Sequence, residues 1–282
     1  MIPILDTHLH LLYTEKFHYD WCDDLPSLAK DFKLGQFEDI VSEHELAGSL
    51  FMEVDVRESE IAGEAHFFSE LAADDSNSLL GVIAACRPES EKFESLLEET
   101  LTDKVCGLRR VLHTQPDEIS QSSLFRRNLQ SLAKRNLPFD LCFTQAQHPI
   151  AAELVEACPD TSFVLDHCGV PNIDPADFDA WKKSMQALAE MPNLNCKVSG
   201  IIAYCASAEA ATLETLRPWI ETTVESFGVE RCLIGTDYPV CNLTAGVQPW
   251  LGMVREFFAS FSESEQEAIF NRNAQRVYGI SI

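Results

Sequence analysis

The sequence predicts an α/β protein, a single-domain (β/α)8 barrel spanning residues 1–282. Eight short apolar or β-branched segments alternate with longer polar segments, which is the pattern of a parallel sheet whose strands are joined by helices. No Pro-, Gly- or Ser-rich linker interrupts the series, and the 282 residues suit one barrel, which usually needs about 250. An open, doubly wound sheet would carry a glycine-rich turn after its first strand, and here that segment ends in Asp6-Thr7-His8-Leu9-His10.

Each expected strand is rich in the aliphatic and aromatic residues that favour a buried parallel sheet. In chain order the strands are expected at residues 4–10, 47–55, 79–87, 105–113, 137–144, 161–169, 194–200 and 231–240. Apolar residues recur every three or four positions, as in amphipathic helices, within 151–158, 178–191 and 208–227. The first connection, residues 11–46, is the longest and includes Trp21, so we expect it to form a partial lid over substrate.

Charge and composition exclude several classes of function. Acidic residues outnumber basic ones by 45 to 21, a net charge of −24 that repels nucleic acid. No apolar run reaches the roughly 20 residues of a membrane span, and no signal peptide is recognisable, so we expect a cytoplasmic protein that does not contact a membrane. The ten cysteines form no C-x-x-C pair, which favours reduced thiols. The sequence leaves the oligomeric state open between a monomer and a homo-oligomer.

Polar residues gather where the expected strands end, the face on which barrel enzymes build their active sites. His8 and His10 are two positions apart on one strand, so both project from the same face and can reach one cation or one substrate oxygen. The other strand ends supply Arg109, Arg110, His113, Asp140, Asp166, His167, Lys197, Ser199 and Asp237. We expect these side chains to converge on one pocket. Cys168 should point away from it, because neighbours in a strand face opposite sides.

Several short motifs follow one another along nearly the whole chain. They are Asp6-Thr7-His8-Leu9-His10, Trp21 followed by Asp31-Phe32, Gly107-Leu108-Arg109-Arg110, Leu137-Pro138-Phe139-Asp140-Leu141, Leu165-Asp166-His167-Cys168-Gly169, Cys196-Lys197-Val198-Ser199-Gly200, Gly235-Thr236-Asp237-Tyr238-Pro239 and Asn273-Ala274 with Tyr278. In this order and spacing they resemble the amidohydrolase superfamily, specifically the amidohydrolase-2 branch that includes sugar-lactone and dicarboxylate-lactone hydrolases.

The resemblance implies a hydrolase that opens a small-molecule lactone, most directly a sugar-derived one, by attack of water. It implies that Asp237 is the general base and that His8, His10 and His167 surround the carbonyl. We assign substrate binding to Arg109, Arg110, His113, Trp21 and Lys197. The resemblance also implies one divalent ion, with Zn²⁺ the first choice, held by His8, His10 and Asp237. A metal-free route stays open, because the strand-four lysine and strand-five histidine of metal-dependent relatives are missing.

Three other functions stay open. A metal-dependent decarboxylase of the same superfamily branch is the first, although such enzymes normally retain the strand-five histidine. The second is a Schiff-base aldolase that uses Lys197, because barrel lysines can attack carbonyl substrates. The third is an inactive barrel that serves as a binding module, against which the intact histidines and Asp237 argue.

Overall fold

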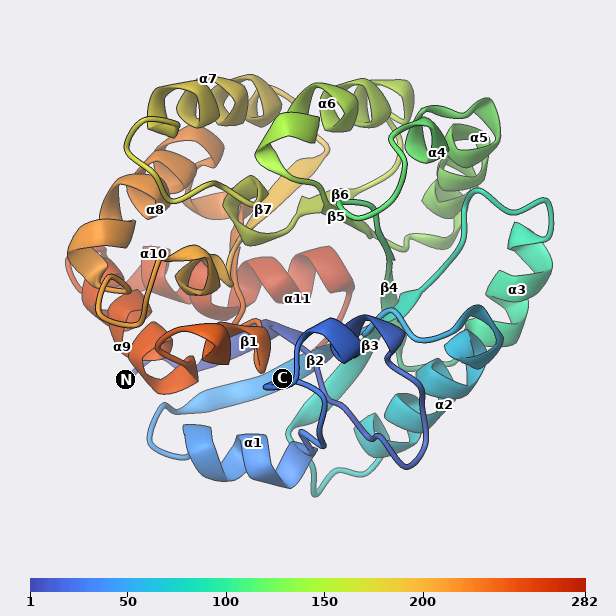
Figure 1. Ribbon diagram of the computed structural model, residues 1–282, viewed down its shortest axis with the longest axis horizontal. Coiled ribbons are helices and arrows are strands. Elements are labelled where there is room, and N and C mark those ends of the chain that lie inside the picture. Colours follow the sequence, from blue (N-terminus) through green and yellow to red (C-terminus); the bar gives the residue numbers. More distant parts are fainter.

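The computed structural model describes residues 1–282 and shows eight parallel strands that follow one another around a barrel (Figure 1). The strands are β1 (Ile4–Leu9), β2 (Leu46–Met52), β3 (Leu79–Ala85), β4 (Val105–Val111), β5 (Phe139–Cys142), β6 (Phe163–Leu165), β7 (Leu194–Val198) and β8 (Cys232–Ile234). Past the last residue of β8, Tyr238 pairs with Leu9 in a parallel bridge, which joins the end of the sheet to its beginning. The predicted (β/α)8 fold is confirmed.

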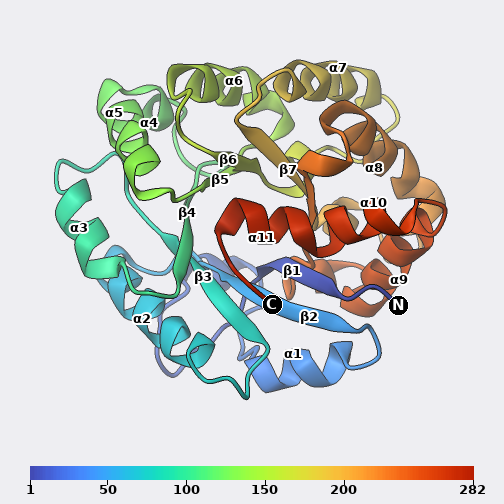
Figure 2. The same cartoon turned by 180° about the vertical axis from the view of Figure 1, so that it is seen from behind.

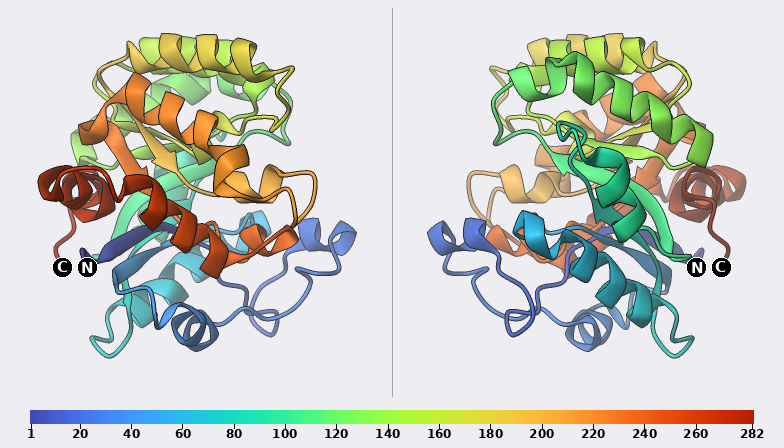
Figure 3. Two further views of the ribbon diagram at one scale, coloured as in Figure 1. Left: turned by 90° about the vertical axis from the view of Figure 1, so that its left-hand side faces the viewer. Right: turned by 90° about the vertical axis from the view of Figure 1, so that its right-hand side faces the viewer.

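Helices surround the strands on the outside (Figures 1 and 3). They are α1 (Leu34–Val41), α2 (Ile61–Ala72), α3 (Phe93–Thr100), α4 (Glu118–Gln121), α5 (Ser123–Leu132), α6 (His148–Ala157), α7 (Phe178–Ala189), α8 (Leu213–Phe227), α9 (Val247–Phe258), α10 (Glu263–Glu267) and α11 (Asn273–Tyr278). The helix expected over 208–227 begins only at Leu213. Thr212 caps it by accepting the backbone N–H of Thr215, which fixes the start of the helix there. None of the helices is both long and apolar enough to cross a membrane.

The hydrophobic core has two parts. The larger part fills the space between the barrel and its helices. The smaller part lies inside the barrel, where strand residues such as Leu5 and Ile83 meet Ala274 and Tyr278 of α11. Figure 2 shows α11 lying across this end of the barrel. Because α11 closes the end where the strands begin, the opposite end is left for a site.

The first connection lies on the side of the molecule away from both chain ends (Figure 3). It contains a short 3₁₀ turn at Asp20–Asp24, and α1 occupies its last third. An antiparallel bridge between Leu12 and Phe32 ties the segment back on itself. Its role as a lid stays a prediction.

Candidate active site

A cavity of about 390 Å³ opens at the carboxyl ends of the strands, a size typical of small-molecule sites. Its lining comes from the segments that follow the strands and from the first connection. The polar part consists of His10, Asp55, Arg109, His113, Thr114, His167 and Asp237. The predicted residues His10, Trp21, Arg109, His113, His167 and Asp237 therefore meet at one cavity, with His8 directly beneath them.

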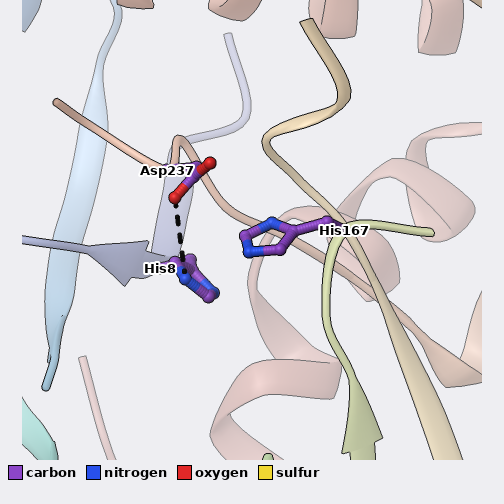
Figure 4. Close-up of side chains that lie close together, drawn as sticks. All are labelled: His8, His167 and Asp237. Atoms are coloured by element: carbon purple, nitrogen blue, oxygen red, sulfur yellow. Dashed lines mark ion pairs between the residues drawn. The ribbon is translucent and has the colours of Figure 1, made fainter. Parts of the chain in front are cut away.

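His8 in β1 and His10, directly after β1, lie close to Asp237. The Nε2 atoms of His8 and His10 lie 3.1 Å apart, and Asp237 Oδ1 lies 3.8 Å from the first and 3.4 Å from the second. His167 stands beside this group, with its ring centre 4.3 Å from that of His8 (Figure 4). All four side chains are buried or nearly so, so their charges and lone pairs act with little screening by water.

Asp6, which was not assigned a role, positions this cluster. One of its carboxylate oxygens accepts the backbone N–H groups of His8 and Thr236, and the other accepts the hydroxyl of Thr236 at 2.5 Å. The backbone N–H of Asp237 donates to the carbonyl of His8 at 2.8 Å. These bonds tie the end of β1 to the segment after β8, which holds Asp237 beside the histidines.

The backbone around the cavity is unusual for residues with side chains. Asp55, His167, Val170 and Asp237 all line the cavity and have φ values between 45° and 56°. This left-handed region is uncommon for residues other than glycine and costs most for a β-branched one such as Val170. Strain of this kind concentrates at functional sites, so its distribution supports a site in this cavity.

Gly200 lets Asp237 and His167 approach each other. A Cβ atom at this position would lie 2.5 Å from both Asp237 Oδ2 and His167 Nδ1, and Gly200 itself has a φ of 65°. Both the backbone angle and the missing side chain are therefore required here. His167 Nδ1 also lies 3.0 Å from the hydroxyl of Ser199, which orients the ring.

The turn after β6 corrects one expectation. The strand predicted over 161–169 ends at Leu165, and His167 and Cys168 lie in a left-handed turn. Cys168 is nevertheless fully buried, and its thiol donates to the carbonyl of Lys197 at 3.7 Å. The thiol thus lies away from the cavity as expected, but because of the turn and not because of strand alternation.

Burial disfavours the protonated form of two of these histidines. Burial lowers the pKa of His8 well below its usual value and also lowers that of His167. The Nδ1 atom of His10 lies 3.0 Å from the carbonyl oxygen of Met52 and donates to it, which leaves Nε2 free to accept a proton or bind a cation. The lowered pKa values of His8 and His167 favour the unprotonated rings that bind metal.

Arg109 lies in the cavity, but a buried carboxylate holds most of its guanidinium. Its Nε donates to Glu53 Oε1 at 2.7 Å and its Nη2 to the carbonyl oxygen of Glu53 at 2.8 Å. The remaining Nη1 lies 3.3 Å from His8 Nε2. Glu53 follows β2 and was not anticipated from the sequence, although it is the one acidic residue directly after that apolar segment. The role of Arg109 as a substrate ligand stays a prediction.

Two other predicted substrate ligands lie at the cavity. The Nδ1 atom of His113 lies 3.1 Å from the thiol of Cys142, and burial lowers the pKa of His113 to about 4. The indole N–H of Trp21 donates to the carbonyl of Val54 at 2.8 Å, which fixes the ring against the cavity. Their contact with substrate stays a prediction.

Arg110, which was expected to bind substrate, lies outside the cavity. Its Nε donates to Glu89 Oε1 at 2.9 Å, and its Nη1 lies 3.6 Å from Asp55 Oδ1. Successive residues of a strand point to opposite sides, so Arg109 faces the cavity and Arg110 cannot. Contact of Arg110 with substrate stays a prediction that this position does not favour.

Lys197 was also expected to bind substrate, and it is fully buried beneath the cavity. Its ammonium donates to Asp140 Oδ2 at 2.5 Å and to the carbonyl of Thr7 at 2.8 Å, and it lies 3.4 Å from His8 Nδ1. Lys197 precedes the last residue of β7, so its side chain points into the barrel interior and does not reach the mouth. This position gives the Schiff-base aldolase no support, and contact of Lys197 with substrate stays a prediction.

The cluster fits a divalent cation. Ligands around a tetrahedral Zn²⁺ at bonds of about 2.0–2.1 Å lie roughly 3.3 Å from one another, and the facing atoms of His8, His10 and Asp237 are 3.1–3.8 Å apart. His8, His167 and Asp237 also bring ligand atoms within 4.8 Å of one another, as do Cys142, Asp166 and His167. Imidazole and carboxylate donors are those that Zn²⁺ prefers.

Known proteins resemble this chain over nearly its whole length. The family model described as amidohydrolase matches residues 5–280. The uncharacterized protein y4mH of Sinorhizobium fredii is 27% identical, over 99% of this chain and 99% of its own. The L-fucono-1,5-lactonase of Burkholderia multivorans is 23% identical, over 98% of this chain and 96% of its own.

Solved structures share the fold. An amidohydrolase from Burkholderia multivorans with bound zinc superposes with a TM-score of 0.89 at 22% identity, covering 99% of this chain and 100% of that chain. A 2,6-dihydroxybenzoate decarboxylase from Rhizobium superposes with a TM-score of 0.65 at 15% identity, covering 99% of both chains. At these identities the likeness shows a common barrel and does not choose between the reactions.

Proposed function

The chain belongs to the amidohydrolase family, and on that premise we propose that it is a hydrolase that opens a lactone by attack of water. The observation that carries the proposal is the buried cluster of Asp237, His8 and His10 at the cavity, with oxygen and nitrogen atoms 3.1–3.8 Å apart. A relative of nearly full coverage named L-fucono-1,5-lactonase supports the substrate class. Its name also makes a sugar-derived lactone the first expectation.

Asp237 acts as the general base in this proposal. Its carboxylate takes a proton from water, the water oxygen bonds to the lactone carbonyl carbon, and the ring C–O bond then breaks. The proton returns from Asp237 to the alkoxide that leaves, so that the product is a hydroxy acid. The Nη1 atom of Arg109, beside His8, supplies positive charge near the oxygen on which negative charge develops.

The metal in this proposal is one divalent ion, Zn²⁺, at His8, His10 and Asp237. When bound there it would polarise the carbonyl and make water more acidic. Asp166 belongs to the other possible ligand set, with Cys142 and His167. Its carboxylate lies 3.5 Å from the ammonium of Lys197 and 3.6 Å from the guanidinium of Arg109. Because these cations already balance its charge, a second ion at Asp166 is disfavoured.

The function is tested with a lactone panel. Purified protein should open at least one member of a set of aldono-1,4-lactones, aldono-1,5-lactones, alkyl-substituted lactones and aromatic-pathway lactones, measured as proton release in weak buffer. The Asp237→Asn protein serves as the control for spontaneous opening. If no lactone is opened, but carbon dioxide is released from dihydroxybenzoates, the decarboxylase takes its place. Inactivity in both assays would favour the binding module.

We predict at most one tightly held divalent ion per chain. Elemental analysis of dialysed protein should show it, and His10→Ala should lower the content, because His10 contributes one of the three ligands. A cobalt-substituted sample should lack a thiolate-to-cobalt absorption band, and Cys142→Ser should keep the ion. Two ions per chain, or a thiolate band that disappears in Cys142→Ser, would contradict this assignment and place the ion at Cys142, Asp166 and His167.

A further inference from the structure

More than half of the cavity lining is apolar. Hydrophobic residues supply ten of its 17 lining positions. Those of the first connection and of the turn after β8 form a group that we call the apolar wall, which consists of Trp21, Leu25, Leu28, Val240 and Leu243. Among the charged residues that line the cavity, Asp55 and Arg109 come from other strand ends, whereas Asp237 lies three residues before Val240. The cavity therefore combines a polar catalytic cluster with the apolar wall.

The apolar wall includes surface that folding would ordinarily bury. The large hydrophobic residues exposed anywhere in the chain are Met1, Leu25, Leu243 and Ile282. Met1 and Ile282 are the two chain ends, whereas Leu25 is 36% exposed and Leu243 is 41% exposed, and both line the cavity. They come from segments more than 200 residues apart in sequence. Exposed apolar surface gathered at one cavity marks a binding site for an apolar group.

Three of the lining residues beyond the catalytic cluster already have partners within the protein. The Asp55 carboxylate lies 3.3 Å from Arg87 and 3.6 Å from Arg110. The indole N–H of Trp21 is donated to a backbone carbonyl, and His113 Nδ1 lies against the Cys142 thiol. Outside the catalytic cluster, the hydroxyls of Thr114 and Tyr204 remain for a polyhydroxylated ring, which would recover only part of the hydrogen bonds to water that it loses on entering the cavity.

We propose that the lactone carries an apolar chain or aryl group, which packs on the apolar wall while its ester lies at Asp237 and the histidines. This inference rests on the proposed lactone hydrolysis, and the experiment below decides between it and the sugar-derived lactone. Each methylene that leaves water on the wall should raise kcat/KM by roughly three- to fourfold until the wall is covered.

The experiment compares kcat/KM across γ- and δ-lactones with side chains from methyl to hexyl and across aldonolactones of the same ring sizes. Alkyl lactones should be preferred, with a rise for each added methylene. Leu25→Asn and Leu243→Asn should flatten that rise, because asparagine removes apolar surface at similar size. Ile282→Asn is the matched control, since Ile282 is also a large exposed aliphatic residue, 57% exposed, but does not line the cavity. Thermal midpoints of all variants verify that the fold is retained.

Two results would overturn the inference while leaving lactone hydrolysis in place. One is equal or faster turnover of the aldonolactones, and the other is an unchanged chain-length effect in the wall variants. Failure to open any lactone would instead overturn the proposed function. In that case the wall is tested by binding alone. The apolar wall is supported if the thermal midpoint rises with the alkyl chain length of added lactone, and rises less in the Leu25 and Leu243 variants. The absence of such a rise overturns it.

Discussion

Asp237→Asn should reduce kcat for lactone opening by about 10²–10⁴-fold, the usual contribution of a positioned base. Asparagine has nearly the same volume as aspartate but cannot take a proton from water near neutral pH. The fold should survive, because Asp237 has a φ of 56° and asparagine is among the residues that tolerate this left-handed conformation. Its backbone bond to the carbonyl of His8 is also retained.

Turnover, thermal midpoint and bound metal together identify what Asp237 does. Rate loss together with loss of the ion shows that the carboxylate is also a ligand, whereas rate loss at constant ion content shows a base alone. Asp55→Asn is a matched control, because Asp55 lines the same cavity with a similar backbone angle but pairs with Arg87 and Arg110. Its loss of rate should be much smaller. An Asp237→Asn protein with normal turnover and stability would leave Asp237 as a turn residue only.

The barrel could be predicted from sequence because its strands are buried on both faces and read as short apolar runs. The ends of the strands could not be placed so well. The strand expected over 161–169 ends at Leu165, and the backbone enters a left-handed turn at His167 and Cys168. The residues His167 and Cys168 do not predict that turn, because residues other than glycine adopt a left-handed backbone only when the surrounding structure requires it.

The catalytic cluster could be predicted because the carboxyl ends of barrel strands share one face. Position near a strand end, however, specifies neither the side nor the depth of a side chain. Arg109 and Arg110 are adjacent and only the first reaches the cavity, while Lys197 lies a layer below it. Glu53 could not be predicted as a site residue, because its partner Arg109 is far away in sequence. The pairing of two such buried charges can be recognised only once the fold is known.

Lys197→Met should destabilise the protein by about 3–5 kcal/mol, the usual cost of removing one partner of a buried ion pair. Methionine preserves most of the apolar stem but removes the ammonium that donates to Asp140 and to the carbonyl of Thr7. Asp140 is fully buried, and its remaining partner is the hydroxyl of Tyr278 at 2.9 Å. Urea unfolding measures the loss. Lys183→Met on the exposed face of α7 is the control and should change stability by no more than about 0.5 kcal/mol.

The loss in Lys197→Met should also depend on pH in one direction. Burial raises the pKa of Asp140, and Lys197 opposes that rise, so removing the ammonium raises the pKa further. A carboxyl whose folded pKa exceeds its unfolded value costs stability as pH rises above the unfolded value, near 4. The variant should therefore lose more stability at pH 8 than at pH 5. Adding Asp140→Leu should recover much of the loss, because no buried charge is then left alone. If the Lys197→Met protein were as stable as the wild type at both pH values, Asp140 would need no cation. The ion pair beneath the site would then contribute nothing to folding.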